Sequence, residues 1–228
     1  MKEPFYQSKT LWSSILVVAV FLCAFVIPVF PAAIGNSLLK SGFSLIFISG
    51  IMSMERRKWS ILGLATAAFV LQWISEILEL NFLTEASRVI NVLFFMVVVF
   101  ILIRQMASAR IVNARVILES ISGYLLLGLI FSVLIAAIMQ ADPDAFNVTL
   151  KENNGLQPAT PSISVPLYFG FVTLATVGYG DIVPLKPYTR SLATFISISG
   201  QLYVVTIIGL LIGKFISKRN NEQIDATK

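Results

Sequence analysis

The chain has 228 residues, of which 57% are hydrophobic and only 13% are charged. Such a chain cannot expose the surface of an ordinary soluble protein, which places it in a membrane. It has a formal net charge of +5, no histidine, and Cys23 as its single cysteine, which excludes an intrachain disulfide. No nucleotide loop, zinc cluster or activated nucleophile is recognisable. We expect no enzymatic activity, no cofactor and no nucleic-acid partner.

Six apolar segments are long enough, or nearly long enough, to cross a bilayer as helices, since about 20 residues span its hydrocarbon core. In chain order they are residues 11–30, 37–54, 59–80, 89–103 with its flanks, 120–140 and 191–216. The second is short and contains Lys40 near one end. The first could be taken for a signal peptide, but its apolar run is longer than a typical signal core. The sequence therefore predicts an all-α membrane protein with six transmembrane helices.

The positions of lysine and arginine predict the orientation of these spans. With six crossings, most positive residues lie on one side: Lys2, Lys9, Arg56, Arg57, Lys58, Arg104, Arg110, Arg115, Lys214, Lys218 and Arg219. That side should be cytoplasmic. We therefore expect the protein in the cell membrane with both termini inside and the loop at 141–165 outside.

The fourth predicted span lacks the charges of a voltage sensor. A sensing helix needs several arginines at three-residue spacing, because each charge that crosses the field contributes about 2.3 kcal/mol per 100 mV. No charge lies between Arg88 and Arg104, and Arg104, Arg110 and Arg115 are spaced by six and five. We interpret these three arginines as cytoplasmic topology anchors. Residues 1–112 should form a four-helix membrane domain in the layout of a voltage sensor, but without its gating arginines.

Three acidic residues lie in or near the predicted spans, and the role of two of them is open. Glu76 and Glu79 are three residues apart, so they share a helix face in the outer half of the third span. They either lie at the interface, solvated or paired with Arg88, or sense protons or ions. Glu119 follows Arg115 by four residues, which predicts a helix-face pair at the inner membrane surface.

The motif that carries the chemistry is Thr176-Val177-Gly178-Tyr179-Gly180-Asp181, between the fifth and sixth spans. Carbonyl oxygens that point toward a common axis can replace the water shell of a potassium ion, as in the T-V-G-Y-G filter of potassium channels. Gly178 and Gly180 allow alternate residues to leave the usual backbone regions, and the Thr176 hydroxyl adds one oxygen at the inner end. The alternative is a plain Gly-Tyr-Gly turn; the apolar segments on both sides favour the filter.

A short helix is predicted before the filter, from Pro166 to about Ala175, because proline is a favoured first helical residue. Entering from outside and ending midway, this re-entrant pore helix would point its partially negative C-terminus at the pore centre, where it favours a cation. Non-helical backbone at membrane depth must be buried by protein or line water. Since one chain supplies one filter strand, the sequence implies an oligomer.

Residues 113–219 resemble the pore module of the tetrameric potassium channels, over a little under half of the chain. The resemblance implies four chains around one axis and a pore domain at 113–219. It also implies potassium sites lined by Thr176, Val177, Gly178 and Tyr179, with Gly180 completing the filter.

Further positions match this family or depart from it. Tyr168 and Phe169 occupy the place of paired tryptophans that brace the filter, so Tyr168 could donate its hydroxyl to Asp181. Val172 stands where some members have a glutamate that pairs with this aspartate, so that clamp is absent. Gly200 and Arg190 stand at the spacings of the hinge glycine and of the arginine that opens the inner helix.

The last span should carry the gate. Ile208, Leu211, Ile212 and Phe215 follow Gly200 at helical spacing, and a ring of such side chains can close a pore by contact or dewetting. Helix packing explains the spacing equally well. Residues 220–228 are expected to be a short cytoplasmic tail without a ligand-binding domain, which leaves lipid, tension, a partner subunit and the outer acids as gating stimuli.

Together these features predict a homotetrameric, potassium-selective channel that conducts passively and is not voltage-gated in the usual way. Its expected partners are its own copies, membrane lipid and potassium, with an unidentified regulatory subunit left open. Two alternatives remain: a membrane component of a potassium transporter, and a structural or regulatory subunit that does not conduct alone.

Overall fold

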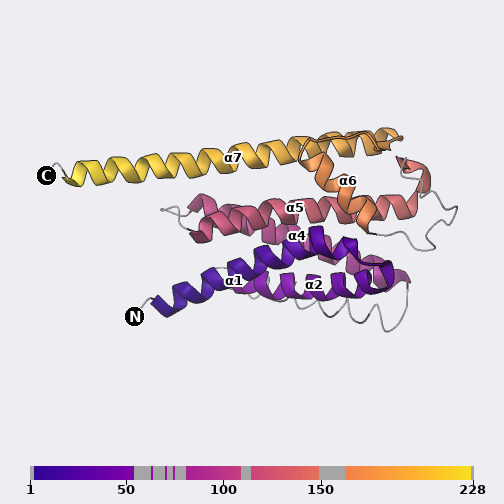
Figure 1. The fold of residues 1–228 in the computed structure, drawn as a ribbon, viewed down its shortest axis with the longest axis horizontal. Helices are drawn as coiled ribbons and strands as arrows, with labels where there is room; N and C mark the ends of the chain where they lie inside the picture. Colours follow the sequence, from indigo (N-terminus) through magenta and orange to yellow (C-terminus); the bar gives the residue numbers. More distant parts are fainter. Residues whose placement is uncertain are drawn as a thin grey trace.

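The computed structural model describes residues 3–53, 81–108, 114–148 and 163–226, together with Gly63, Val70 and Ile74. Long helices that lie side by side along one direction dominate this part of the chain (Figure 1). They are α1 (Glu3–Phe21), α2 (Ala32–Ser53), α4 (Asn81–Ser108), α5 (Ala114–Ala141) and α7 (Pro187–Ala226), with the short α6 (Ser164–Leu174) crossing between α5 and α7.

Among the described residues, three helical segments are long and apolar enough to cross a membrane: Thr10–Val29, Arg115–Ala141 and Pro187–Gly213. They correspond to the first, fifth and sixth predicted spans. Shorter apolar stretches, Ser41–Ser53 and Val92–Arg104, lie at the second and fourth. The third, at 59–80, lies almost wholly outside the described residues. A mainly helical membrane protein is thus confirmed, and the count of six spans stays a prediction.

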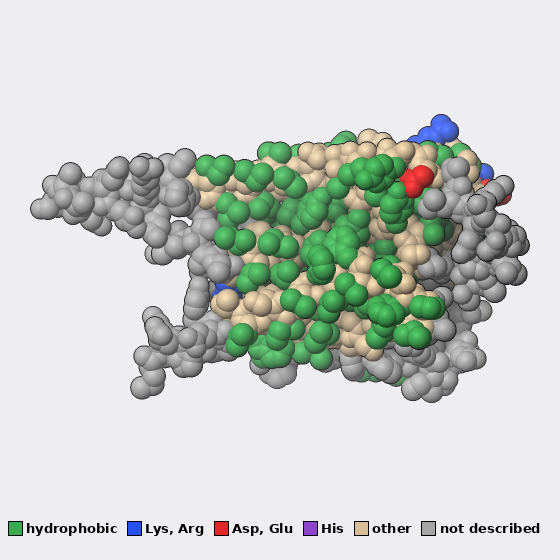
Figure 2. Space-filling view, viewed as in Figure 1, with side chains coloured by type: hydrophobic (Ala, Val, Ile, Leu, Met, Phe, Trp, Pro, Cys, Tyr) green, Lys and Arg blue, Asp and Glu red, His purple; other side chains and the backbone are tan. Residues whose placement is uncertain are grey.

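The surface of the described chain is that of a protein surrounded by a membrane. Figure 2 shows hydrophobic side chains spread across one face of the molecule, with the charged side chains visible there near its ends. Large apolar side chains such as Phe100, Leu202 and Val205 are more than 60% exposed in the single chain. A soluble protein rarely exposes such continuous apolar area, whereas lipid or a neighbouring copy covers it without cost.

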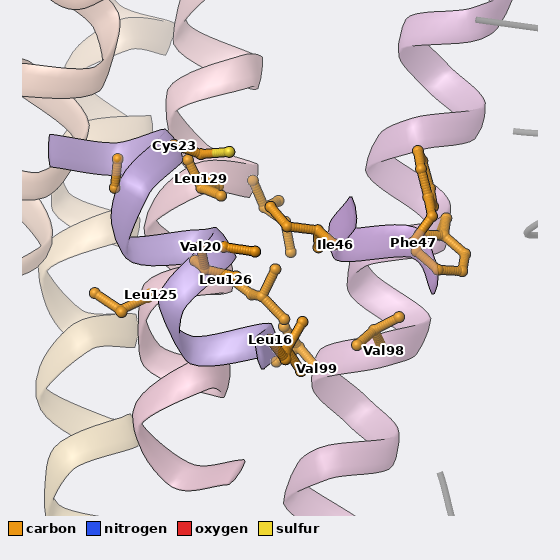
Figure 3. Packing of buried hydrophobic residues seen from close by; sticks show 14 of the residues in the cluster. Leu16, Val20, Cys23, Ile46, Phe47, Val98, Val99, Leu125, Leu126 and Leu129 are labelled. Atoms are coloured by element: carbon orange, nitrogen blue, oxygen red, sulfur yellow. The ribbon is translucent and has the colours of Figure 1, made fainter. Parts of the chain in front are cut away.

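Helices α1, α2, α4 and α5 share one hydrophobic core. Leu16 and Val20 of α1 belong to this core together with Leu126 of α5 and Ile46 of α2 (Figure 3). The rings of Phe47 and Phe94 join α2 to α4 with centroids 4.4 Å apart. The other fully buried members of this core include Cys23, Val98 and Leu102.

An ionic cluster is buried where α1, α2 and α5 meet. Arg115 Nε lies 2.7 Å from Glu119 Oε1, which confirms the predicted pair. The same guanidinium donates through Nη2 to the Ser53 carbonyl at 3.0 Å, and the Ser13 hydroxyl lies 3.0 Å from that of Ser53 and 3.4 Å from Glu119 Oε1. The pair is therefore enclosed by protein. Arg115 has a packing role that its interpretation as a topology anchor missed, whereas Arg104 is exposed.

Two features of the second half were not predicted. Strands β1 (Phe146–Val148) and β2 (Ile182–Pro184) form a short antiparallel pair, with Asn147 opposite Val183. Helix α7 continues to Ala226, through most of the predicted tail at 220–228, and extends beyond the other helices (Figure 1).

Candidate ion-conduction site

Helix α6 leads directly into the filter motif. It begins at Ser164, two residues before the predicted start, so that Pro166 lies in the first turn, where its missing N–H is not needed. The helix lies close to α5, because a side chain at Gly170 would meet Ser132 Oγ at 2.5 Å and one at Gly128 would overlap the Phe171 ring. Small residues thus bring α6 against α5, and α6 ends at Leu174, next to the motif.

The backbone of the motif alternates between two conformations. Thr176, Gly178 and Gly180 have positive φ angles of 56°, 56° and 81°, and the residues between them do not. Residues 177–179 form neither helix nor hydrogen-bonded turn. The two glycines adopt this conformation at little steric cost, as predicted. In an ordinary extended strand, successive carbonyls point in alternate directions. Every second residue of this motif leaves the extended backbone conformation and interrupts that alternation.

Thr176 was predicted to contribute its hydroxyl, but the positive φ of its backbone was not predicted. It is the one non-glycine residue with positive φ among those described, and a β-branched residue rarely adopts this conformation. Two hydrogen bonds hold the segment: Thr176 N donates to Thr173 O at 3.0 Å, and Val177 N donates to Val172 O at 2.9 Å. The end of α6 thus holds the first residue of the motif in an unfavourable geometry.

One chain does not cover the motif. Residues 175–180 are all exposed, and the exposed fractions of Val177 and Tyr179 are 50% and 72%. A Cβ atom added to Gly178 or Gly180 would meet nothing within 4 Å in the described structure. Within the described structure, the support of the motif comes from contacts with α6 and α7 near its two ends.

That support includes the predicted contact between Tyr168 and Asp181. The Tyr168 hydroxyl donates to Asp181 Oδ2 at 2.5 Å, and Asp181 Oδ1 accepts from the backbone N–H of Ile182 at 3.1 Å. Phe169 is buried and packs edge-on against Phe146 of β1, with ring centroids 5.2 Å apart. The two aromatic residues therefore connect α6 to the short β1–β2 pair and to the residue that precedes β2.

Helix α7 supports the inner end. The Ser197 hydroxyl donates to Thr173 O at 3.1 Å, and Gln201 Nε2 donates to Thr176 Oγ1 at 3.2 Å. Between them, Gly200 lies so close to Leu174 that any Cβ would overlap the Leu174 carbonyl oxygen. Helix α7 is uninterrupted through Gly200. This glycine therefore has a packing role, and the hinge role implied by the resemblance remains a prediction.

The predicted gate residues divide into two groups. Ile208 and Ile212 are exposed and lie seven and eleven residues after Gln201, hence on the same helix face. Leu211 is half-buried and packs with Tyr203 and Ile207, so it faces the interior of the chain. Phe215 belongs to α7 at the same face spacing, but its side chain lies outside the described residues.

The outer end of the site has its own set of contacts, which the sequence did not indicate. The Tyr188 hydroxyl donates to Asp142 Oδ2 at 2.6 Å, and this bond, more than the Asp144 N–H and Lys186, lowers the pKa of the Asp142 carboxyl. Thr189 Oγ1 donates to the Ala145 carbonyl at 3.2 Å, and Arg190 Nε donates to that of Pro184 at 3.3 Å. The first two bonds attach the start of α7 to the segment after α5, and the third attaches it to the end of β2.

Two further predicted residues cannot be placed. Glu76 and Glu79 lie outside the described residues, and so does the side chain of Arg88. Both interpretations of the acids therefore remain predictions.

Comparison with known proteins points to the same half of the chain. Residues 123–217 match the family model described as "Ion channel"; the match begins within α5 and ends within α7. A 64-residue segment is 34% identical to the voltage-gated potassium channel Kch of Escherichia coli (strain K12). This segment makes up 28% of this chain and 15% of that relative. The match thus spans a small part of the relative's length. No solved structure matches the chain. Residues 123–217 are similar to ion channels, in a chain whose apolar helices are those of a membrane protein.

Proposed function

We propose that this protein is a potassium-selective channel in which four copies surround one axis. Potassium passes down its electrochemical gradient through sites lined by Thr176, Val177, Gly178, Tyr179 and Gly180. The observation that carries this proposal is the positive φ at Thr176, Gly178 and Gly180. Left-handed residues at alternate positions turn successive carbonyls toward the same side, and four such strands supply rings of oxygen atoms that replace the hydration shell of the ion.

The helix before the filter supports the same chemistry. Helix α6 ends at Leu174, two residues before Thr176, and its C-terminus carries the partial negative charge of the helix dipole. Four such ends around one axis stabilise a cation near the inner end of the filter. The Tyr168–Asp181 bond holds the outer end, since Asp181 follows Gly180 directly.

The uncovered surfaces favour an assembly of identical copies. Non-helical backbone at membrane depth must be buried by protein or line water, and residues 175–180 are exposed in the single chain. Phe195, Ile198 and Leu202 of α7 are also more than half exposed. A homotetramer in the cell membrane, with its termini in the cytoplasm and lipid around it, satisfies both requirements.

Conduction should not depend on voltage in the usual way, because residues 89–103 of α4 carry no charge. The face of α7 that begins at Gln201 and continues through Val205, Ile208 and Ile212 would line the pore below the filter. Rings of Ile208, Ile212 and Phe215 then form the gate.

Reconstitution of the purified full chain tests the proposal. In liposomes with a salt gradient, we expect potassium flux that greatly exceeds sodium flux and that barium blocks. Equal permeability to potassium and sodium would exclude a potassium-selective filter. Saturable transport that requires a second ion would favour a transporter component, and a folded tetramer without flux would favour a regulatory subunit. Single-channel recording at several voltages tests the proposed lack of voltage gating. A steep change of open probability with voltage would contradict that proposal.

A further inference from the structure

The side chain of Gln201 bonds to the first residue of the filter motif from a different helix. Its Nε2 donates to Thr176 Oγ1 at 3.2 Å, across 25 residues of sequence. We propose that Gln201 is a positioning residue for the innermost potassium site, which it serves by fixing the Thr176 hydroxyl as an ion ligand. This inference rests on the proposed channel function and adds to it a residue outside the filter.

The chemistry of the hydroxyl explains why a donor is needed. A threonine hydroxyl has one O–H donor and two acceptor lone pairs, and it rotates to suit its neighbours. The amide N–H of Gln201 occupies one lone pair of Thr176 Oγ1, which leaves the second for a cation. An apolar side chain at position 201 would leave the hydroxyl free to rotate, so that it would present its hydrogen to the pore for part of the time.

The position of Gln201 is set by two contacts of α7, at Ser197 one turn earlier and at the adjacent Gly200. Ser197 Oγ donates to the Thr173 carbonyl at 3.1 Å, which ties α7 to the last turn of α6. Gly200 allows the α7 backbone to approach the Leu174 carbonyl. These two contacts hold α7 against the end of α6. The backbone of α7 therefore places the Gln201 amide within reach of Thr176.

Four copies would place four such amides around the inner mouth of the filter. Each amide is uncharged and provides a carbonyl oxygen in addition to its N–H donors. Such a ring orients the filter hydroxyls without adding a fixed charge that would hold a cation too tightly for it to leave. The site formed by the Thr176 oxygens would therefore bind a potassium ion that has lost part of its hydration shell.

Barium block measures the affinity of this innermost site, because barium is doubly charged and similar in size to potassium. The full-length channel is recorded in planar bilayers with barium added on the side of the protein termini. We expect Gln201→Met, which removes the donor, and Gln201→Asn, which shortens its reach, each to raise the half-blocking barium concentration on the order of fivefold. Thr206→Val is the matched control, since Thr206 is an exposed polar residue about 140° around the same helix. It should change the value by less than about twofold.

A second pair of measurements separates positioning from stability. In a Thr176→Cys background the thiol is a poor acceptor, so Gln201→Met should have little further effect on barium affinity. Stabilisation of the detergent-solubilised tetramer by barium, followed as a shift in melting temperature, gives the same affinity for a variant that does not conduct.

The possible failures are distinguishable. A wild-type protein that conducts sodium and potassium equally overturns the channel proposal itself. A potassium-selective wild type whose barium affinity is unchanged in both Gln201 variants overturns the role of Gln201 and leaves the channel intact. A lower melting temperature with unchanged barium affinity also overturns it, because the side chain would then be structural only.

Discussion

The hydroxyl of Tyr168 donates a hydrogen bond to Asp181 Oδ2 at 2.5 Å, which joins the middle of α6 to the residue that follows the filter. Asp181 also accepts from the Ile182 N–H at its other oxygen. Val172, one turn further along α6, carries no carboxyl group that could share this aspartate. Within the described structure, Tyr168 is thus the α6 side chain that holds Asp181.

We expect Tyr168→Phe to destabilise the conducting filter, because it leaves Asp181 without this donor while keeping the ring. In recordings from bilayers, potassium currents should decay on the order of tenfold faster than in the wild type. Tyr188→Phe is the matched control, since it removes a tyrosine–aspartate bond of 2.6 Å that lies outside the filter. Equal decay in the two variants would show that the Tyr168 bond does not hold the filter.

Replacing Glu119 should destabilise the fold more than any exposed charge does. The Glu119 and Arg115 side chains are only 3% and 8% exposed, so Glu119→Gln leaves a buried guanidinium without its charged partner. Breaking a buried pair in this way costs about 3–5 kcal/mol. Denaturant unfolding of the solubilised protein measures the loss. Arg104→Gln changes an exposed charge and should cost less than about 0.5 kcal/mol; a similar cost for both variants would contradict the importance of burial.

Substitution of Gly200 distinguishes packing from a hinge. Gly200→Ala would place a Cβ on the Leu174 carbonyl oxygen, so we expect it to disturb the end of α6 and to lower both thermal stability and potassium flux. Gly213→Ala is the control within the same helix, because nothing described lies within 4 Å of its added Cβ. Alanine there should stabilise the helix by about 1 kcal/mol. If Gly200→Ala keeps its stability and changes open probability alone, the hinge explains this glycine better.

Acidification should remove the contribution of the Asp142–Tyr188 bond. The bond lowers the pKa of Asp142 in the folded protein, so its stabilising effect is present above the unfolded pKa and is lost as pH falls through the lowered folded pKa. The melting temperature of the wild type should therefore exceed that of Tyr188→Phe at neutral pH, and the two should converge in acid. A difference that is independent of pH would mean that Tyr188 acts by packing alone.

The features that could be predicted from the sequence depend on local properties of the chain. Hydrophobic runs of sufficient length identify membrane helices whatever their neighbours are, and the described structure has such helices at the first, fifth and sixth predicted positions. Gly178 and Gly180 indicated the alternating backbone, because glycine tolerates positive φ without help from its surroundings. Pro166 placed the start of α6 to within two residues.

The remaining features were decided by tertiary structure, because they join residues that are far apart in the chain. The positive φ of Thr176 is unfavourable for threonine and is observed where the end of α6 and the Gln201 amide both contact that residue. The Arg115–Glu119 spacing predicted a helix-face pair, but its burial depends on Ser13 and Ser53 of two other helices. Gly200 shows the same limit, since its spacing suggests a bend, whereas the neighbouring Leu174 carbonyl gives it a packing role. Hydropathy and backbone freedom act at one position at a time. Which helix face meets which partner follows from how the whole bundle packs.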